Sequence, residues 1–131
     1  MIDLVLAFDD SDADLGVYFA LCKDDSVEII NSLEENRERI RYTQIPAIRC
    51  TTAYLDISLQ ALKDVPFIWA AFTHGDENSI TIANVSFVEV GNDNSLFKDS
   101  FFYTNSCSCG LNLGQDLIDQ NCRVFIGYKK K

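Results

Sequence analysis

The sequence FFYTNSCSCG, residues 101–110, is the most informative stretch for the fold that we expect of this chain. It begins with three aromatic residues, which are typical of a buried strand, and then changes to small and polar residues. A short helical pattern marked by Leu113 and Leu117 follows directly. A thiol at the junction of a buried strand and a helix is held on a rigid support and faces outward. The stretch therefore predicts a strand–helix unit that presents a candidate cysteine nucleophile.

Apolar runs elsewhere in the chain predict further strands. Ile2–Phe8 and residues 67–73 read as buried strands of a parallel sheet, and Pro46 limits a run at 41–49 to an edge strand or an irregular connection. Two short strands meet around Asn84, and VFIGY at 124–128 is the last strand. Helical patterns lie between the strands at 12–22, at 27–33 after a break at Asp24 and Asp25, at 52–62 and at 113–118. This alternation predicts one α/β domain over residues 1–131, a three-layer sandwich with a central, mostly parallel sheet flanked by helices.

Composition narrows the classes of partner. Apolar residues make up 47% of the 131 residues, which indicates a globular chain. A net charge of −9 argues against nucleic acid as a partner and favours basic peptides or basic protein surfaces. The apolar run at the N-terminus is too short for a signal core or a membrane span. Five cysteines do not make a fully paired disulfide framework, so we expect reduced thiols, a cytoplasmic location and no membrane association.

The only histidine of the chain, His74, also follows an apolar strand. Carboxyl ends of parallel strands share one edge of a sheet, so His74 and the thiols of 107–109 are expected at the same edge. A cysteine nucleophile needs a base or a positive partner to form thiolate near neutral pH. Gly75 lets the backbone approach a substrate and point its N–H at a developing oxyanion. Composition alone leaves open an ordinary surface or core histidine beside ordinary buried cysteines.

Two segments together carry a family resemblance. FIWAAFTHGD at 67–76, a hairpin, FFYTNSCSCGL at 101–111, a helix and CRVFIGY at 122–128 resemble the caspase-like cysteine peptidases. That group includes caspases, metacaspases, clostripain-like enzymes and CHAT domains. The residues NSCSCG at 105–110 are similar to the metacaspase form Asp-Ser-Cys-His-Ser-Gly and to the CHAT form Ser-Ala-Cys-Glu-Thr-Gly.

The resemblance implies a role for each matching residue. Cys107 is expected to be the nucleophile and His74 the general acid–base, with the backbone N–H groups of Gly75 and Cys107 as the oxyanion hole. Asp9, at the end of the first strand, and Asn105 are implied in substrate binding, and Asn105 stands where metacaspases carry aspartate. The implied function is cysteine-dependent hydrolysis of a peptide or protein substrate by a His/Cys dyad, without a cofactor and without a third catalytic residue.

The end of the chain suggests a first alternative. It stops soon after Tyr128, whereas family members usually continue with another strand and specificity loops. The first alternative is therefore a catalytically inactive caspase-like module that binds partners or assembles. In one form of it, a homodimer or a complementing chain completes the edge of the sheet.

The cysteines and acidic residues suggest other, simpler interpretations. The second alternative is a thiol redox or metal-binding module that uses Cys107 and Cys109, although we expect no metal. The remaining cysteines are expected to be small core residues: Cys22, Cys50 and Cys122. A helix N-terminus that favours carboxylates explains the acidic cluster Asp9, Asp10, Asp12 and Asp14.

Overall fold

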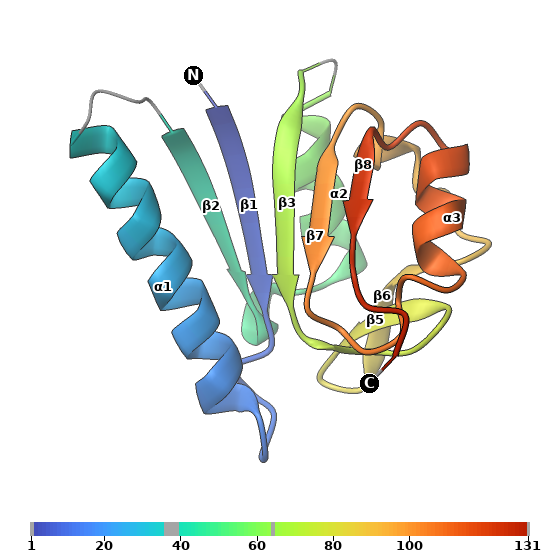
Figure 1. The fold of residues 1–131 in the computed structure, drawn as a ribbon, viewed down its shortest axis with the longest axis horizontal. Helices are drawn as coiled ribbons and strands as arrows, with labels where there is room; N and C mark the ends of the chain where they lie inside the picture. The colour runs from blue at the N-terminus through green and yellow to red at the C-terminus, as the bar shows by residue number, and fades with distance from the viewer. Residues whose placement is uncertain (1, 36–39, 64, 131) are drawn as a thin grey trace.

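A parallel sheet organises the protein in a computed structural model that describes residues 2–35, 40–63 and 65–130. In that part of the chain the sheet has five strands in the order β2-β1-β3-β7-β8. The strands are β1 (Ile2–Phe8), β2 (Ile40–Pro46), β3 (Phe67–Phe72), β7 (Phe101–Thr104) and β8 (Val124–Ile126). Every neighbouring pair is parallel, so all five carboxyl ends meet at one edge (Figure 1). The predicted sheet is confirmed, and β2 with Pro46 is an edge strand.

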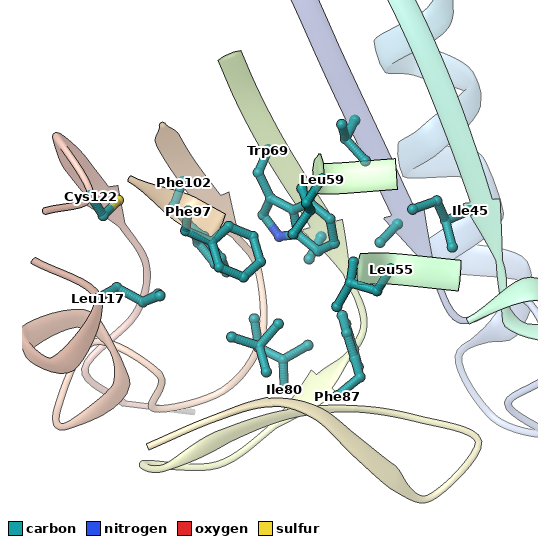
Figure 2. Packing of buried hydrophobic residues seen from close by; sticks show 14 of the residues in the cluster. Ile45, Leu55, Leu59, Trp69, Ile80, Phe87, Phe97, Phe102, Leu117 and Cys122 are labelled. Atoms are coloured by element: carbon teal, nitrogen blue, oxygen red, sulfur yellow. The ribbon is translucent and has the colours of Figure 1, made fainter. Parts of the chain in front are cut away.

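Helices cover the two faces of the sheet and make three layers. Helix α1 (Gly16–Glu35) packs on one face through Phe19 and Ile30, which contact Leu6 and Phe72 of the sheet. On the other face lie α2 (Thr52–Gln60) and α3 (Leu113–Asp119), and Leu59 and Leu117 belong to the larger core there. Figure 2 shows this core around Trp69 of β3. The short 3₁₀ turns η1 (Ala47–Arg49) and η2 (Ser95–Phe97) complete the helical segments of the described chain.

Helix α1 differs from what the sequence predicted. We expected a break at Asp24 and Asp25, but one helix runs through them from Gly16 to Glu35. Both aspartates are exposed, and Lys23 pairs with Asp24 at 2.5 Å. A charged pair on the solvent side of a helix does not interrupt the apolar face, so the two predicted helical pieces are one element.

A second, three-stranded sheet lies between β3 and β7 in the sequence. Its strands β4 (His74–Gly75), β5 (Ser79–Ile82) and β6 (Val85–Glu89) are antiparallel. Ala83 and Asn84 join β5 to β6 with φ values of 51° and 63°, the left-handed pair of a tight hairpin turn. The prediction of two strands joined at Asn84 is confirmed, and buried Ile80 and Val88 attach the hairpin to the larger core.

The two faces are covered unequally over β7 and β8. On one face Phe102 and Phe125 stack with ring centroids 5.4 Å apart, inside the larger core. Strand alternation turns Phe101, Val124 and Ile126 to the opposite face, and all three are exposed. Figure 1 shows α1 on the β2 side of the sheet, and it shows α2 behind the sheet. Among the described residues, the helix on this face therefore covers the sheet only in part.

Candidate functional site

Three loops meet at the carboxyl edge of the parallel sheet. The chain leaves β1 at Asp9, β3 at Thr73 and β7 at Asn105. Asp9 N–H donates to the Phe72 carbonyl at 3.0 Å, and Asn105 N–H donates to the Ala71 carbonyl at 3.3 Å. The order β1-β3-β7 thus places the loop with His74 between the acidic loop and the cysteine loop. This is the edge where parallel sheets carry their sites.

Buried hydroxyl groups fix the ends of β3 and β7 to each other. The Ser106 hydroxyl donates to the Thr73 carbonyl at 2.9 Å, and the Ser106 N–H donates to the Thr104 hydroxyl oxygen at 3.1 Å. The Thr104 hydroxyl donates to the Ala71 carbonyl at 3.0 Å. The side chains of Thr73, Thr104 and Ser106 are all buried. Because Thr73 and Ser106 directly precede His74 and Cys107, these bonds hold the two candidate residues on adjacent, rigid backbone.

An open pocket of about 370 Å³ lies beside Cys107. It is lined by Gly75, Asp76, Glu77, Asn78, Cys107 and Ser108. The Glu77 carbonyl accepts hydrogen bonds from Asn112 N–H at 3.2 Å and Leu113 N–H at 3.0 Å, which tie the histidine loop to the start of α3. The Cys107 N–H donates to none of the described residues. The two backbone positions predicted for the oxyanion hole, Gly75 and Cys107, therefore border the same pocket.

His74 is held by contacts that the sequence did not predict. Its Nε2 atom lies 2.9 Å from an Asp12 carboxylate oxygen, and its ring meets Phe19 edge-on with centroids 5.3 Å apart. Within the described part of the chain, the Cys107 thiol forms no hydrogen bond with His74 or with any other residue. The histidine is thus oriented from the α1 side, whereas the half-buried Cys107 thiol borders the pocket.

Cys109 has a different environment from Cys107. It is fully buried, and its Sγ atom donates to the Ser79 carbonyl at 3.4 Å. Burial and the nearby Asp76 carboxylate raise the pKa of the Cys109 thiol to about 12. Such a thiol is protonated at neutral pH and packs as a small core residue. Its position supports the choice of Cys107 as the reactive thiol of the pair.

The structure separates the two residues expected to bind substrate. The buried Asp9 carboxylate accepts hydrogen bonds from Ser11 Oγ at 2.6 Å and from Ala83 N–H at 3.0 Å, so it ties the acidic loop to the β5–β6 turn. Asn105 lies near Tyr18 of α1, and its Oδ1 atom is buried without a hydrogen-bond partner among the described residues. No hydrogen bond joins Asp9 to Asn105 in the described structure. The two residues therefore do not form one shared polar contact here.

Asp12 is the site residue that sequence reasoning missed. One carboxylate oxygen, Oδ1, accepts from Leu15 N–H at 2.7 Å and from Asp14 N–H at 2.9 Å at the start of α1. The contacts of Oδ1 agree with the role expected for the acidic cluster at a helix N-terminus. The other oxygen, Oδ2, contacts His74. No spacing in the sequence pointed to this contact, because it joins residues that are 62 positions apart.

The remaining cysteines, Cys22, Cys50 and Cys122, lie in or against the two hydrophobic cores. All five cysteines are free thiols. Cys122 is buried, whereas Cys22 and Cys50 are half-buried against the two cores. Burial raises the pKa of the Cys50 thiol to about 12. Among the residues that the structure describes, no group of three or more His, Cys, Asp or Glu side chains is arranged to hold a metal ion.

The chain was compared with protein-family models, with curated proteins and with solved structures, and none of the three comparisons found a match. No helix within the described residues is long and apolar enough to cross a membrane.

Proposed function

We propose that this chain is a cysteine-dependent peptide-bond hydrolase of the caspase-like kind, with Cys107 as nucleophile and His74 as general acid–base. One observation carries the proposal: Gly75 and Cys107 border the same pocket, on loops that Ser106 and Thr73 lock together. The order of elements also supports it. A parallel strand ends at His74-Gly75, a hairpin follows, and the next strand leads to Cys107, a helix and a last parallel strand.

The reaction would proceed by acyl transfer. His74 takes the proton of the Cys107 thiol, and the sulfur attacks the peptide carbonyl to form a tetrahedral oxyanion. The N–H groups of Gly75 and Cys107 stabilise the negative charge on that oxygen. His74 then gives the proton to the leaving amine as the C–N bond breaks, which leaves a thioester. Water attacks the thioester with His74 as base, and this step releases the acid and restores the thiol.

A second candidate function is a non-catalytic caspase-like module that binds partners. One observation favours it: in the described structure the Cys107 thiol has no hydrogen bond to His74. Because nucleophile–base contacts are often long before substrate binds, the missing contact does not by itself decide between the two functions. Only reactivity separates them.

The test is covalent labelling with peptidyl acyloxymethyl ketones that carry Lys, Arg, Asn or Leu next to the ketone. We expect an adduct at Cys107, mapped by mass spectrometry, that is absent in Cys107→Ser. In His74→Ala the labelling rate should fall by roughly a hundredfold or more, the usual contribution of a general base. Cys22→Ser is the matched control, because it removes a half-buried thiol away from the pocket and should label normally.

Two outcomes would count against the proposal. Absence of an adduct across the panel, with folded protein shown by circular dichroism, would favour the binding module. Labelling of Cys107 at the same rate in His74→Ala would show an ordinary surface thiol. If Cys107 is labelled in a His74-dependent way, a fluorogenic peptide that carries the residue of the fastest-labelling ketone should be turned over, and this turnover would establish hydrolysis.

A further inference from the structure

We infer that Asp12 is a positioning residue that sets the tautomer of His74 and so presents the free ring nitrogen, Nδ1, as the base. The inference rests on the proposed function, because it assigns Asp12 a part in the same reaction. Asp12 lies in the loop between β1 and α1, and its Oδ2 atom is 2.9 Å from His74 Nε2. Neither composition nor the family resemblance pointed to this residue.

The protonation of the pair follows from the other contacts of Asp12. The Leu15 N–H, first, and then the Asp14 N–H and His74 hold the pKa of the Asp12 carboxyl below its usual range, while partial desolvation opposes them. Asp12 is therefore ionised at neutral pH, and an ionised carboxylate can only accept hydrogen bonds. The proton of the 2.9 Å contact must then sit on His74 Nε2. A neutral imidazole with a proton on Nε2 has its lone pair on Nδ1.

The surroundings hold both partners in place. Oδ1 of Asp12 is fixed by Leu15 N–H at 2.7 Å and Asp14 N–H at 2.9 Å, so the carboxylate cannot rotate away from the histidine without losing the two bonds that hold the turn leading into α1. Phe19, one turn into α1, meets the imidazole edge-on at an interplanar angle of 89°. The first turns of α1 thus fix the rotation of the His74 ring as well as its protonation.

This arrangement gives Asp12 a function in each proton transfer. When Nδ1 accepts the proton of Cys107, the ring becomes a cation, and the adjacent carboxylate stabilises that charge. When the ring gives the proton back to the leaving amine, the bond from Nε2 to Asp12 keeps the ring in the same orientation. Asp12 touches neither substrate nor sulfur in this scheme, and it acts through His74.

The substitution Asp12→Asn tests the inference sharply. Asparagine is as good a helix cap as aspartate, so its Oδ1 atom can keep the bonds to Leu15 and Asp14. Its amide nitrogen then faces His74 as a donor and requires Nε2 to be the acceptor. We therefore expect the proton of the neutral ring to move to Nδ1. Asp14→Asn is the matched control, because it removes one negative charge from the same loop at a residue whose side chain has no hydrogen bond in the described structure.

The tautomer is directly readable because the chain has one histidine. Long-range ¹H–¹⁵N correlation on ¹⁵N-labelled protein gives one imidazole pattern, recorded at a pH where its titration shows the neutral ring. We expect a proton on Nε2 in the wild type and in Asp14→Asn, and a proton on Nδ1 in Asp12→Asn. A proton on Nδ1 in the wild type, or the same tautomer in Asp12→Asn, would overturn the inference.

Reactivity gives a second, independent measurement. The rate of Cys107 alkylation by iodoacetamide, followed from pH 5 to pH 9, should fall roughly a hundredfold at neutral pH in Asp12→Asn, as in His74→Ala. Asp14→Asn should keep the wild-type profile. A rate that depends on His74 but not on Asp12 rejects the role of Asp12 and keeps the hydrolase. A tautomer that moves while the rate is independent of His74 rejects the hydrolase and keeps Asp12 as the residue that sets the tautomer.

Discussion

Cys107 and Cys109 are two residues apart in one short turn, and the structure gives them opposite properties. Cys107 is half-buried on the wall of the pocket and has no hydrogen-bond partner for its thiol among the described residues. Cys109 is fully buried, donates to the Ser79 carbonyl and has a pKa raised to about 12. Small and polar residues flank both cysteines in the sequence, so the difference in burial between the two thiols comes from the tertiary structure.

Backbone geometry between the two cysteines produces the difference. Ser108 has a φ of 59°, in the left-handed region that L residues seldom adopt. The reversal at Ser108 lets Cys107 line the pocket while Cys109 turns inward beneath Gly75. Gly110 N–H donates to the Tyr128 carbonyl at 2.9 Å and fixes the far side of the turn. The turn therefore holds one thiol on the pocket wall and the other in the core.

The largest expected effect is the difference in alkylation between the two thiols. At pH 8 a thiol of pKa about 12 is ionised in only about one molecule in ten thousand, and the Cys109 side chain is fully buried, whereas Cys107 lines the open pocket. Iodoacetamide should therefore modify Cys107 in the native protein and leave Cys109 unmodified until denaturant is added. Peptide mapping after timed quenching measures both rates in one sample. Comparable native rates at the two sites would show that burial does not protect Cys109 from the reagent.

Local sequence patterns predicted several features of the fold correctly. Apolar runs predicted the strands because a parallel strand buried on both faces must be apolar throughout, as β1 and β3 are. Asn84 also predicted the turn between two short strands, since a turn depends on backbone groups close by in the sequence. The strand-end placement of His74 and Cys107 followed from the same local patterns.

The features that the sequence did not predict depend on distant contacts. Asp12 reads as a helix-capping residue, and only the fold brings its second oxygen to His74. Asp9 reads as a substrate ligand by resemblance, yet its carboxylate is bonded to the Ala83 turn, 74 positions away. Helix α1 continues through Asp24 and Asp25 because both side chains are exposed to solvent and do not interrupt its buried face. The local sequence pattern does not show that exposure.

The next largest effect is expected at Gly75, which packs directly over Cys109. A Cβ atom there would lie 2.8 Å from Cys109 Sγ, from Ser106 Cβ and from the Ser79 carbonyl oxygen. These atoms are buried and cannot all move aside, so Gly75→Ala should destabilise the fold by about 2–3 kcal/mol, as overpacking does. The midpoint of urea unfolding measures the change. Adding Cys109→Ala to the Gly75→Ala variant should recover part of the loss, since one of the three clashes then disappears, whereas no recovery would show that Cys109 does not pack against this position.

The smallest expected effect is the dependence of stability on alkaline pH. The pKa of Cys109 is higher in the folded protein than in the unfolded chain, so this thiol contributes stability below the unfolded pKa and loses it as pH rises toward about 12. With an unfolded pKa of about 8.5, one such thiol should lower the free energy of unfolding by about 1 kcal/mol between pH 8.5 and 9.5. Cys50, whose pKa is also raised to about 12, adds a similar loss. Urea unfolding at several pH values in this window should give a smaller decline in Cys109→Ala and in Cys50→Ala than in the wild type. An unchanged decline in Cys109→Ala would mean that this thiol is not buried in its protonated form, and the contrast with Cys107 would then rest on geometry alone.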